Sequence, residues 1–215
     1  GVHDPLCASA LVLDNGEAQI ALCAADLIFL SKETTRAIRD NASRKTGIPR
    51  ENIMVSCSHT HSGPVTVNML SNACDPVVPK ADEEYVEFAA GVLSETIVRA
   101  WKGRVPAELA LTTTHAEGVG GNRRAPDGPT DPEVALLVAE TLEGAPIAAI
   151  ANFSLHYVGG AGNVISADYF GAFSEALQRM AGGRFVAIMA NGCCGDTNNV
   201  DRSKPPVEPA RPSAN

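Results

Sequence analysis

Two histidines stand one residue apart in SCSHTHSGP (56–64), as His59 and His61. The apolar run NIMVSC (52–57), directly before them, is typical of a strand. Side chains at positions i and i+2 of a strand project to the same face, so both imidazoles can reach one site. Imidazole can ligate a metal, act as a base beside a nucleophile, or form ordinary hydrogen bonds. The segment alone therefore leaves a metal site, an activated nucleophile and a polar turn open.

A third candidate ligand is His156, which follows a different apolar run, PIAAIANF (146–153). Zinc is held by three or four ligands, and a catalytic zinc keeps one position open. The other histidine near a comparable strand end is His115, after ELALTTT (108–114). On these residues alone, a metal site and hydrogen-bonded turn histidines are about equally supported.

Further polar groups lie in two loop segments. The Gly-rich segment GVGGNRRAPDGP (118–129) carries Arg123, whose planar guanidinium can direct hydrogen bonds to a substrate oxygen. This segment lacks the Lys and Ser/Thr of a phosphate-binding loop, which argues against nucleotide binding. In NGCCGDTNN (191–199), Asp196 could orient a histidine, bind a substrate hydroxyl or close the turn. Its neighbours Cys193 and Cys194 are expected to be buried and inert, because no evident cationic group favours the thiolate.

Two common hydrolase signatures are missing. The sequence has no GxSxG element, which leaves Ser62 little support as a nucleophile. It also has no HExxH element of the helical zinc proteases.

The composition is that of a globular protein, with 45% hydrophobic and 20% charged residues in 215. A net charge of -8 argues against nucleic acid as a partner, because nucleic-acid binders need clustered Lys and Arg. The six cysteines show no CxxC spacing, so no disulfide framework is expected. Neither a run of about 18 apolar residues nor a leader is visible. The compartment stays open, secretion and a periplasmic location included.

Seven short apolar runs predict strands. They are 10–14, 19–26, 52–57, 108–114, 133–140, 146–153 and 184–190. Asn15-Gly16 predicts a two-residue hairpin turn, and Glu143-Gly144 a second one. Three amphipathic helices are expected, one from an N-cap at Ser31 to Gly47, and two over 81–101 and 166–180. In the second helix the spacing indicates an apolar face of Tyr85, Phe88, Val92, Ile97 and Trp101.

These elements predict an α/β fold in which a layered mixed sheet is flanked by helices. Several strand runs are followed directly by polar residues, among them Asp26, His59, His156 and Asn191. In open α/β sheets, ligands bind beyond the carboxyl ends of the strands. We therefore expect these polar groups to converge on one cleft.

Taken together, several segments resemble the N-terminal catalytic domain of the neutral/alkaline ceramidase family and its bacterial relatives. HTHSGP is the most specific of them, and they occur in the family's order over most of the chain. The matching segments are TGIPRENIMVSCSHTHSGP (46–64), NRR (122–124), DGPTDPEVALL (127–137), ANFSLH (151–156), SADYFG (166–171) and NGCCGDTNN (191–199).

The resemblance implies a single catalytic zinc (Zn2+) that activates water to hydrolyse an amide bond in an N-acyl sphingoid or related lipid or small-molecule substrate. It implies His59 and His156 as zinc ligands. It places His61 beside the metal, where it would stabilise an oxyanion or shuttle a proton. Arg123 would contact the substrate or the oxyanion. Asp168 and Asp196 are candidates for orienting histidines or holding a polar head of the substrate. Membrane contact is expected only through the substrate.

Two departures from the family pattern keep alternatives open. Family members complete the zinc shell with a Glu and a Tyr, which are expected outside this chain. Ceramidases carry GDxSP where residues 195–199 read GDTNN, with Asn198 at the Ser position. One alternative is a ceramidase-like hydrolase of another amide or ester. The other is a non-catalytic binding or scaffolding module that has lost its metal.

For the domain organisation, we expect residues 1–199 to be an incomplete ceramidase-like catalytic domain, a fragment of a larger one. Residues 200–215 are Pro-rich and polar, which is typical of a linker or a truncated tail. The oligomeric state stays open.

Overall fold

The computed structural model describes residues 1–69, 75–157, 162–182 and 184–199, so the expected linker at 200–215 lies outside the described residues. The predicted mixed α/β fold is confirmed, with its strands in two main sheets and a two-stranded ribbon. The helices are α1 (Lys32–Thr46), α3 (Glu83–Lys102) and α4 (Asp168–Ala181), with a short 3-10 turn η1 (Arg50–Asn52). The strands are β1 (Ala8–Asp14), β2 (Gln19–Ala25), β3 (Ile53–Cys57), β4 (Ala107–His115), β5 (Gly121–Asn122), β6 (Glu133–Thr141), β7 (Pro146–Phe153), β8 (Val186–Asn191) and β9 (Thr197–Asn198).

The first sheet has the order β1-β2-β3, with β1 antiparallel and β3 parallel to β2. The predicted hairpin between β1 and β2 is present, but its loop spans residues 15–18 instead of two residues. The Asn15 side-chain oxygen accepts the backbone N–H groups of Glu17 and Ala18, which stabilises the longer loop. Gly16 takes the positive φ of 86° that the turn needs.

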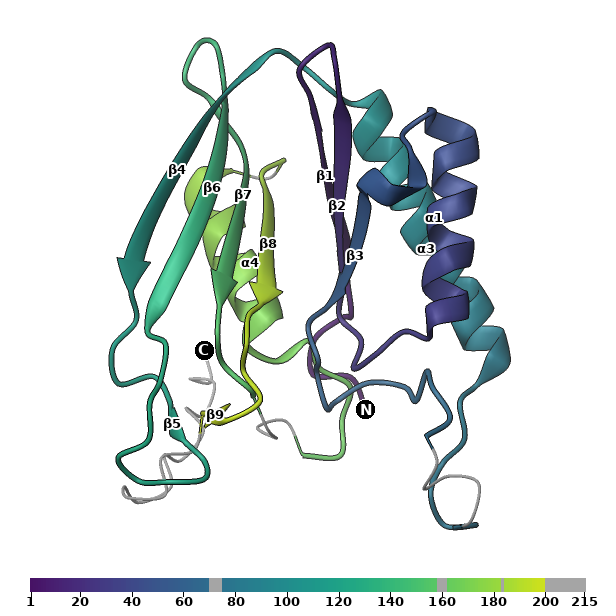
Figure 1. Ribbon diagram of the computed structural model, residues 1–215, viewed down its shortest axis with the longest axis vertical. Helices are drawn as coiled ribbons and strands as arrows, with labels where there is room; N and C mark the ends of the chain where they lie inside the picture. The colour runs from purple at the N-terminus through teal and green to yellow at the C-terminus, as the bar shows by residue number, and fades with distance from the viewer. Residues whose placement is uncertain (70–74, 158–161, 183, 200–215) are drawn as a thin grey trace.

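Helices α1 and α3 pack on one face of this sheet, and the second sheet lies on its other side (Figure 1). Helix α1 begins as predicted, with the Ser31 hydroxyl accepting the Thr34 N–H at 3.0 Å, and ends at Gly47 with φ 78°. The core between the helices and the sheet is apolar and closely packed. Its buried members include Val12, Ala21, Cys23, Ala25, Ile38, Ala42, Ile53, Ala89, Leu93 and Ile97.

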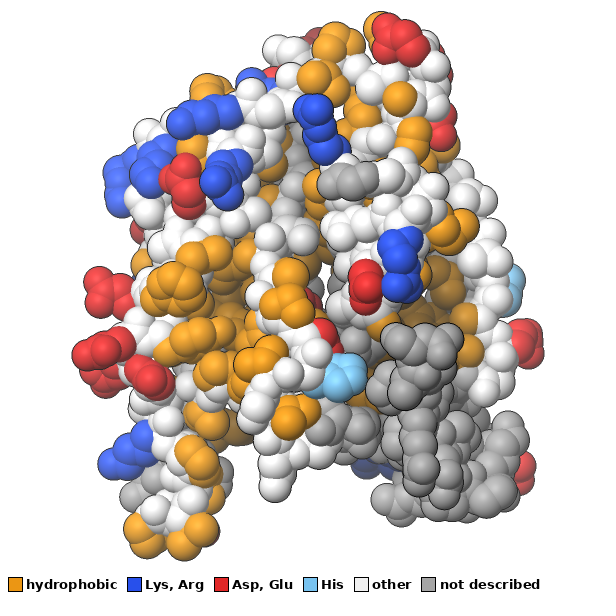
Figure 2. Space-filling view, turned by 180° about the vertical axis from the view of Figure 1, so that it is seen from behind, with side chains coloured by type: hydrophobic (Ala, Val, Ile, Leu, Met, Phe, Trp, Pro, Cys, Tyr) orange, Lys and Arg blue, Asp and Glu red, His pale blue; other side chains and the backbone are white. Residues whose placement is uncertain are grey.

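The apolar face predicted for α3 is only partly correct. Ile97 is buried, but Phe88 is 65% exposed and Val92 is 38% exposed. The residues that face the sheet are instead Ala89 and Leu93, which follow Phe88 and Val92 by one position. A small Ala lets the helix approach the sheet closely, which leaves the larger side chains on the outer face. Figure 2 shows hydrophobic side chains gathered over this helix, with acidic side chains along their margin.

The second sheet has the order β4-β6-β7-β8, in which β7 and β8 are parallel and the other pairs antiparallel. The predicted hairpin at Glu143-Gly144 joins β6 to β7, but its loop spans residues 142–145 instead of two residues. Helix α4 packs its Phe173 and Leu177 against Ala149 of β7 and Ala187 of β8. Strand β8 also contacts β1, β2 and β3, which joins the two sheets. None of the helices in the described part of the chain is long and apolar enough to span a membrane.

The ribbon of β5 and β9 was not predicted. It pairs Gly121 with Asn198 and Asn122 with Thr197, in two segments that read as loops in the sequence. At the preceding Gly120, an added Cβ would lie 2.6 Å from Leu155 Cδ1 and 2.8 Å from the Asn198 carbonyl oxygen. Glycine is therefore required by close packing, and the ribbon fixes the start of the Arg-containing loop.

Candidate metal centre

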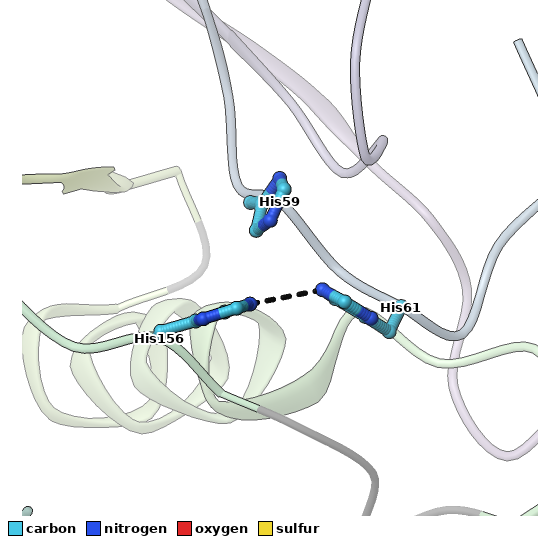
Figure 3. Close-up of side chains that lie close together, drawn as sticks. All are labelled: His59, His61 and His156. Atoms are coloured by element: carbon cyan, nitrogen blue, oxygen red, sulfur yellow. Dashed lines mark hydrogen bonds between the residues drawn. The ribbon is translucent and has the colours of Figure 1, made fainter. Parts of the chain in front are cut away.

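His59, His61 and His156 lie together, although they come from the ends of two different sheets (Figure 3). One nitrogen from each ring lies within 4.8 Å of the others. His59 and His61 follow β3, and His156 follows β7. His156 is buried, His59 is half-buried and His61 is exposed. The convergence expected from the strand ends therefore occurs for all three residues.

His59 is fixed through both its backbone and its ring. Its backbone has a φ of 63°, in the left-handed region that residues other than glycine rarely adopt. Its N–H donates to the Leu27 carbonyl at 3.0 Å, and its ring Nδ1 lies 3.0 Å from the Ile28 carbonyl oxygen. Because a carbonyl oxygen only accepts hydrogen bonds, Nδ1 must carry the proton. The lone pair on Nε2 is then free for a metal, the arrangement usual in metal-ligating histidines.

Arg123, His156 and His61 form a chain of hydrogen bonds. Arg123 Nη1 lies 3.1 Å from His156 Nδ1, and His156 Nε2 lies 3.0 Å from His61 Nε2. A guanidinium group only donates, so Nδ1 of His156 must accept. In neutral His156 the proton then sits on Nε2 and is donated to His61 Nε2. In this metal-free arrangement Arg123 thus holds His156 in the tautomer whose Nε2 is occupied by a proton.

The surroundings of His61 and His156 favour the neutral, uncharged form of both rings. Although His61 is exposed overall, partial desolvation of its ring lowers its pKa, and the neighbouring His59 and Arg123 lower it further, whereas Asp168 opposes them. Burial also lowers the pKa of His156, again with help from His59, His61 and Arg123. Both rings are therefore neutral near pH 7, as metal ligation requires.

Among the described residues, the Asp168 carboxylate hydrogen-bonds to hydroxyl groups and not to a histidine ring. Its carboxylate accepts hydrogen bonds from the Thr60 hydroxyl at 2.6 Å and the Ser62 hydroxyl at 3.3 Å. Thr60 lies between the two histidines of the pair, and all three hydrogen-bonded residues are buried. Asp168 thus holds the backbone that carries His59 and His61. This also gives the Ser62 hydroxyl a structural partner.

Asp196 acts on the site through its backbone. Its carbonyl oxygen accepts the Arg123 N–H at 2.7 Å, whereas its carboxylate has only a 3.5 Å contact with the Thr197 hydroxyl. The Thr197 carbonyl in turn accepts the His156 N–H at 2.8 Å. The β5–β9 ribbon therefore sets Arg123 beside His156. The roles that the sequence left open for Asp196 stay predictions; the contact described here is that of its backbone carbonyl with Arg123.

The two neighbouring cysteines differ from expectation. Cys193 is exposed and Cys194 half-buried, because the turn that carries them lies at the surface. All five described cysteines are free thiols.

Two other strand-end groups lie near the histidine segment without joining the cluster. Asn191 donates its side-chain N–H to the Ser58 carbonyl at 3.3 Å. Asp26 accepts the Cys7 N–H at 2.9 Å, and burial raises its pKa to about 6. His115 is exposed at the end of β4, outside the cluster.

Sequence reasoning missed the groups that support the cluster. The Ile28 carbonyl orients His59, and the Phe29 ring meets the His59 ring edge-on, with centroids 5.0 Å apart. Thr60 was also missed. Its position between two histidines was a usable signal, whereas nothing in the sequence marks one backbone carbonyl among many.

A large cavity lies elsewhere among the described residues. It has a volume of about 900 Å³ and opens between the two sheets, beside the β1–β2 loop and the beginnings of β4, β7 and β8. Leu11, Leu109 and Val186 are among its lining residues. The histidines follow the opposite ends of β7 and of β3, so this cavity is separate from the candidate metal centre.

The fold is similar to that of solved ceramidases. The neutral ceramidase from Pseudomonas aeruginosa matches with a TM-score of 0.79 and 21% sequence identity, over 92% of this chain and 34% of that one. A ceramidase complexed with C2 matches with a TM-score of 0.80 and 20% identity, over 93% of this chain and 34% of that one. No protein-family model and no curated protein sequence matches. The predicted resemblance is thus confirmed at the level of the fold, and this chain spans about a third of the matched ceramidases.

Proposed function

We propose that this chain carries the metal-binding histidines of a zinc-dependent amide hydrolase of the ceramidase type. The observation that carries the proposal is the convergence of His59, His61 and His156 in a ceramidase-like fold. Neutral imidazoles suit zinc among several transition metals, and the lowered pKa values of His61 and His156 supply that neutral form. The substrate would be an N-acyl sphingoid or a related N-acyl compound.

In this proposal His59 and His156 are ligands and His61 is their neighbour. A ligating histidine usually has its second nitrogen engaged, which fixes the ring. Within the described residues, His59 has such a partner in the Ile28 carbonyl. His156 is assigned as a ligand from the family resemblance, because Arg123 only donates to its Nδ1 and has to move before Nε2 can bind a metal. The ring of His61 is exposed and is held only through its Nε2. His61 is therefore the one best placed to turn towards a substrate. Further ligands, a Glu and a Tyr, would come from outside this chain.

Zinc, when bound, would lower the pKa of a water and polarise the substrate carbonyl. Ligation through His156 Nε2 requires the proton there to leave, so Nδ1 must take one up and Arg123 must turn away from it. The released guanidinium would then donate to the oxygen on which negative charge develops, together with His61. One such donor commonly contributes about 3 to 4 kcal/mol to the transition state. Asp168 would hold the histidine segment and Asp196 the Arg123 loop.

Two measurements on the parent protein test the proposal. Zinc content after dialysis against a weak chelator is expected to be stoichiometric, and a protein without zinc would instead be the scaffolding module. A panel of N-acyl substrates with and without a sphingoid base then defines the substrate. Cleavage restricted to substrates without that base would favour the hydrolase of another amide or ester.

A further inference from the structure

We propose that Asp4 is a positioning residue for the histidine cluster and acts through the turn formed by residues 165–168. Asp4 lies on the N-terminal segment, which contributes no ring to the cluster. Its two carboxylate oxygens accept hydrogen bonds from two donors of that turn. The Ser166 hydroxyl donates to Oδ2 at 2.6 Å, and the Ala167 N–H donates to Oδ1 at 2.6 Å. Such charge-assisted bonds are short and strong.

The N-terminal segment runs alongside the turn. Val2 and Ile165 form a parallel β-bridge. The His3 N–H donates to the Ile165 carbonyl at 2.8 Å, and the Ile165 N–H donates to the Gly1 carbonyl at 3.0 Å. The first three residues therefore contact the turn through their backbone, and Asp4 extends this contact through its side chain.

The turn contacts the histidine segment directly. The Ser166 carbonyl accepts the Thr60 hydroxyl at 2.7 Å, and the Ser166 N–H donates to the Ser62 carbonyl at 2.9 Å. The Ser166 hydroxyl, held by Asp4, also accepts the Asp168 N–H at 3.0 Å. Ser166 thus joins Asp4 on one side to the backbone around His61 on the other. Asp168 adds its own bonds to Thr60 and Ser62.

Asp4 supplies the charged acceptor for two hydrogen-bond donors of this turn. Thr60 is 1% and Ser166 2% exposed, so their polar groups have little access to water as a replacement partner. Asp168 also has a left-handed φ of 55°, a conformation that persists only where surrounding contacts impose it. Loss of the Asp4 carboxylate would leave two donors of the turn without their acceptor. The turn would relax and carry Thr60, and with it His59 and His61, away from His156.

The contacts of Asp4 do not depend on a metal, but the metal-affinity consequence rests on the proposed function. The variants are Asp4→Ala and Asp4→Asn, and the control is His3→Ala. The control removes the exposed 2.7 Å contact between His3 Nδ1 and Asp4 but leaves the turn contacts intact. The first readout is the nuclear Overhauser effect between the His61 and His156 ring protons in the metal-free protein. The second is the Kd for zinc, measured by chelator competition, with the visible spectrum of the Co²⁺-loaded protein beside it.

We expect Asp4→Ala to weaken or abolish the ring-to-ring signal and to raise the zinc Kd about tenfold, as is usual for groups that orient ligands. His3→Ala should stay within about twofold of the wild type. Unchanged ring signals and Kd in Asp4→Ala, with or without a lower Tm, would overturn the proposal. If Asp4→Ala does not fold, Asp4→Asn is the deciding variant. It keeps the acceptor Oδ1 for the Ala167 N–H but loses the acceptor for the Ser166 hydroxyl. A wild-type ring signal and a wild-type zinc Kd in Asp4→Asn would also overturn the proposal. A wild type that binds no zinc would refute the proposed function instead, and the ring signal would still decide the role of Asp4.

Discussion

The Nε2 atoms of His61 and His156 lie 3.0 Å apart, although the two residues are 95 positions apart in the chain. Only one of the two nitrogens can carry the shared proton while both rings are neutral. If a second proton bound, both Nε2 atoms would carry an N–H, and the hydrogen bond between the two rings would be lost. The pair is therefore sensitive to pH.

We expect the free energy of unfolding of the metal-free protein to fall as the pH drops below about 6.5, the ordinary pKa of histidine. Burial lowers the pKa of both rings in the folded state, so between that lowered value and 6.5 the unfolded chain binds more protons. Urea unfolding curves at several pH values would measure the slope. The variants His61→Gln and His156→Gln should flatten it, whereas His115→Gln, whose ring is exposed, should not. An unchanged slope in both cluster variants would contradict the expectation.

In the parent protein, the double variant His59→Ala, His156→Ala should lose both stoichiometric zinc and amide hydrolysis. Both ligands that this chain is proposed to supply are then gone, and the Glu and Tyr expected elsewhere in the parent are too few to hold zinc stoichiometrically. Elemental analysis and hydrolysis of an N-acyl substrate are the measurements. His115→Ala serves as the matched control, because that histidine lies outside the cluster. Full zinc retention in the double variant would remove the ligand assignment.

Arg123→Ala should separate catalysis from metal binding. We expect hydrolysis to fall by about 10²- to 10³-fold, the usual effect of losing one oxyanion donor. Zinc affinity should stay the same or rise, because the guanidinium no longer holds His156 in the tautomer that competes with the metal. The control Arg124→Ala removes an exposed neighbouring guanidinium. A parallel loss of zinc and activity in Arg123→Ala would show that this residue supports ligation instead.

Gly120→Ala should destabilise the protein by about 1–3 kcal/mol, the usual cost of overpacking. The new Cβ would meet Leu155 Cδ1 at 2.6 Å and the Asn198 carbonyl oxygen at 2.8 Å, which pushes the β5–β9 ribbon away from His156. Chemical denaturation measures the change. Gly195→Ala is the control, because its added Cβ meets nothing within 4 Å. Equal stability of the two variants would mean that the ribbon is not tightly packed.

Much of the fold could be predicted because its signals are local. Alternating burial along β2 follows from residues next to each other in the chain, as do the Ser31 cap and the Gly144 turn. The β5–β9 ribbon could not be predicted, because each strand has two residues and its partner lies far along the chain. In α3 the predicted face was correct for Tyr85, Ile97 and Trp101. It was wrong by one position at Phe88 and Val92, since side-chain size alone does not tell which of Phe88 and Ala89 meets the sheet.

The histidines of the candidate site could be predicted from the sequence, but most of the groups that position them could not. The proximity of the three histidines was predicted from the strand-end positions of His59 and His156, together with the family resemblance. Ile28 contributes a backbone carbonyl, which nothing in the sequence marks, whereas Thr60 could have been noticed from its position between the two histidines. Asp168 was expected near the site, but its bonds to Thr60 and Ser62 depend on a turn whose shape only the structure shows.

At His59 the backbone conformation favours glycine, whereas the proposed metal centre needs an imidazole. A side chain with a φ of 63° carries a strain of about 1–3 kcal/mol that glycine does not have. Glycine there would relieve this strain, but it would delete the imidazole together with its hydrogen bond to Ile28 and its ring contact with Phe29. The imidazole of His59 is therefore present in spite of the backbone strain at this position.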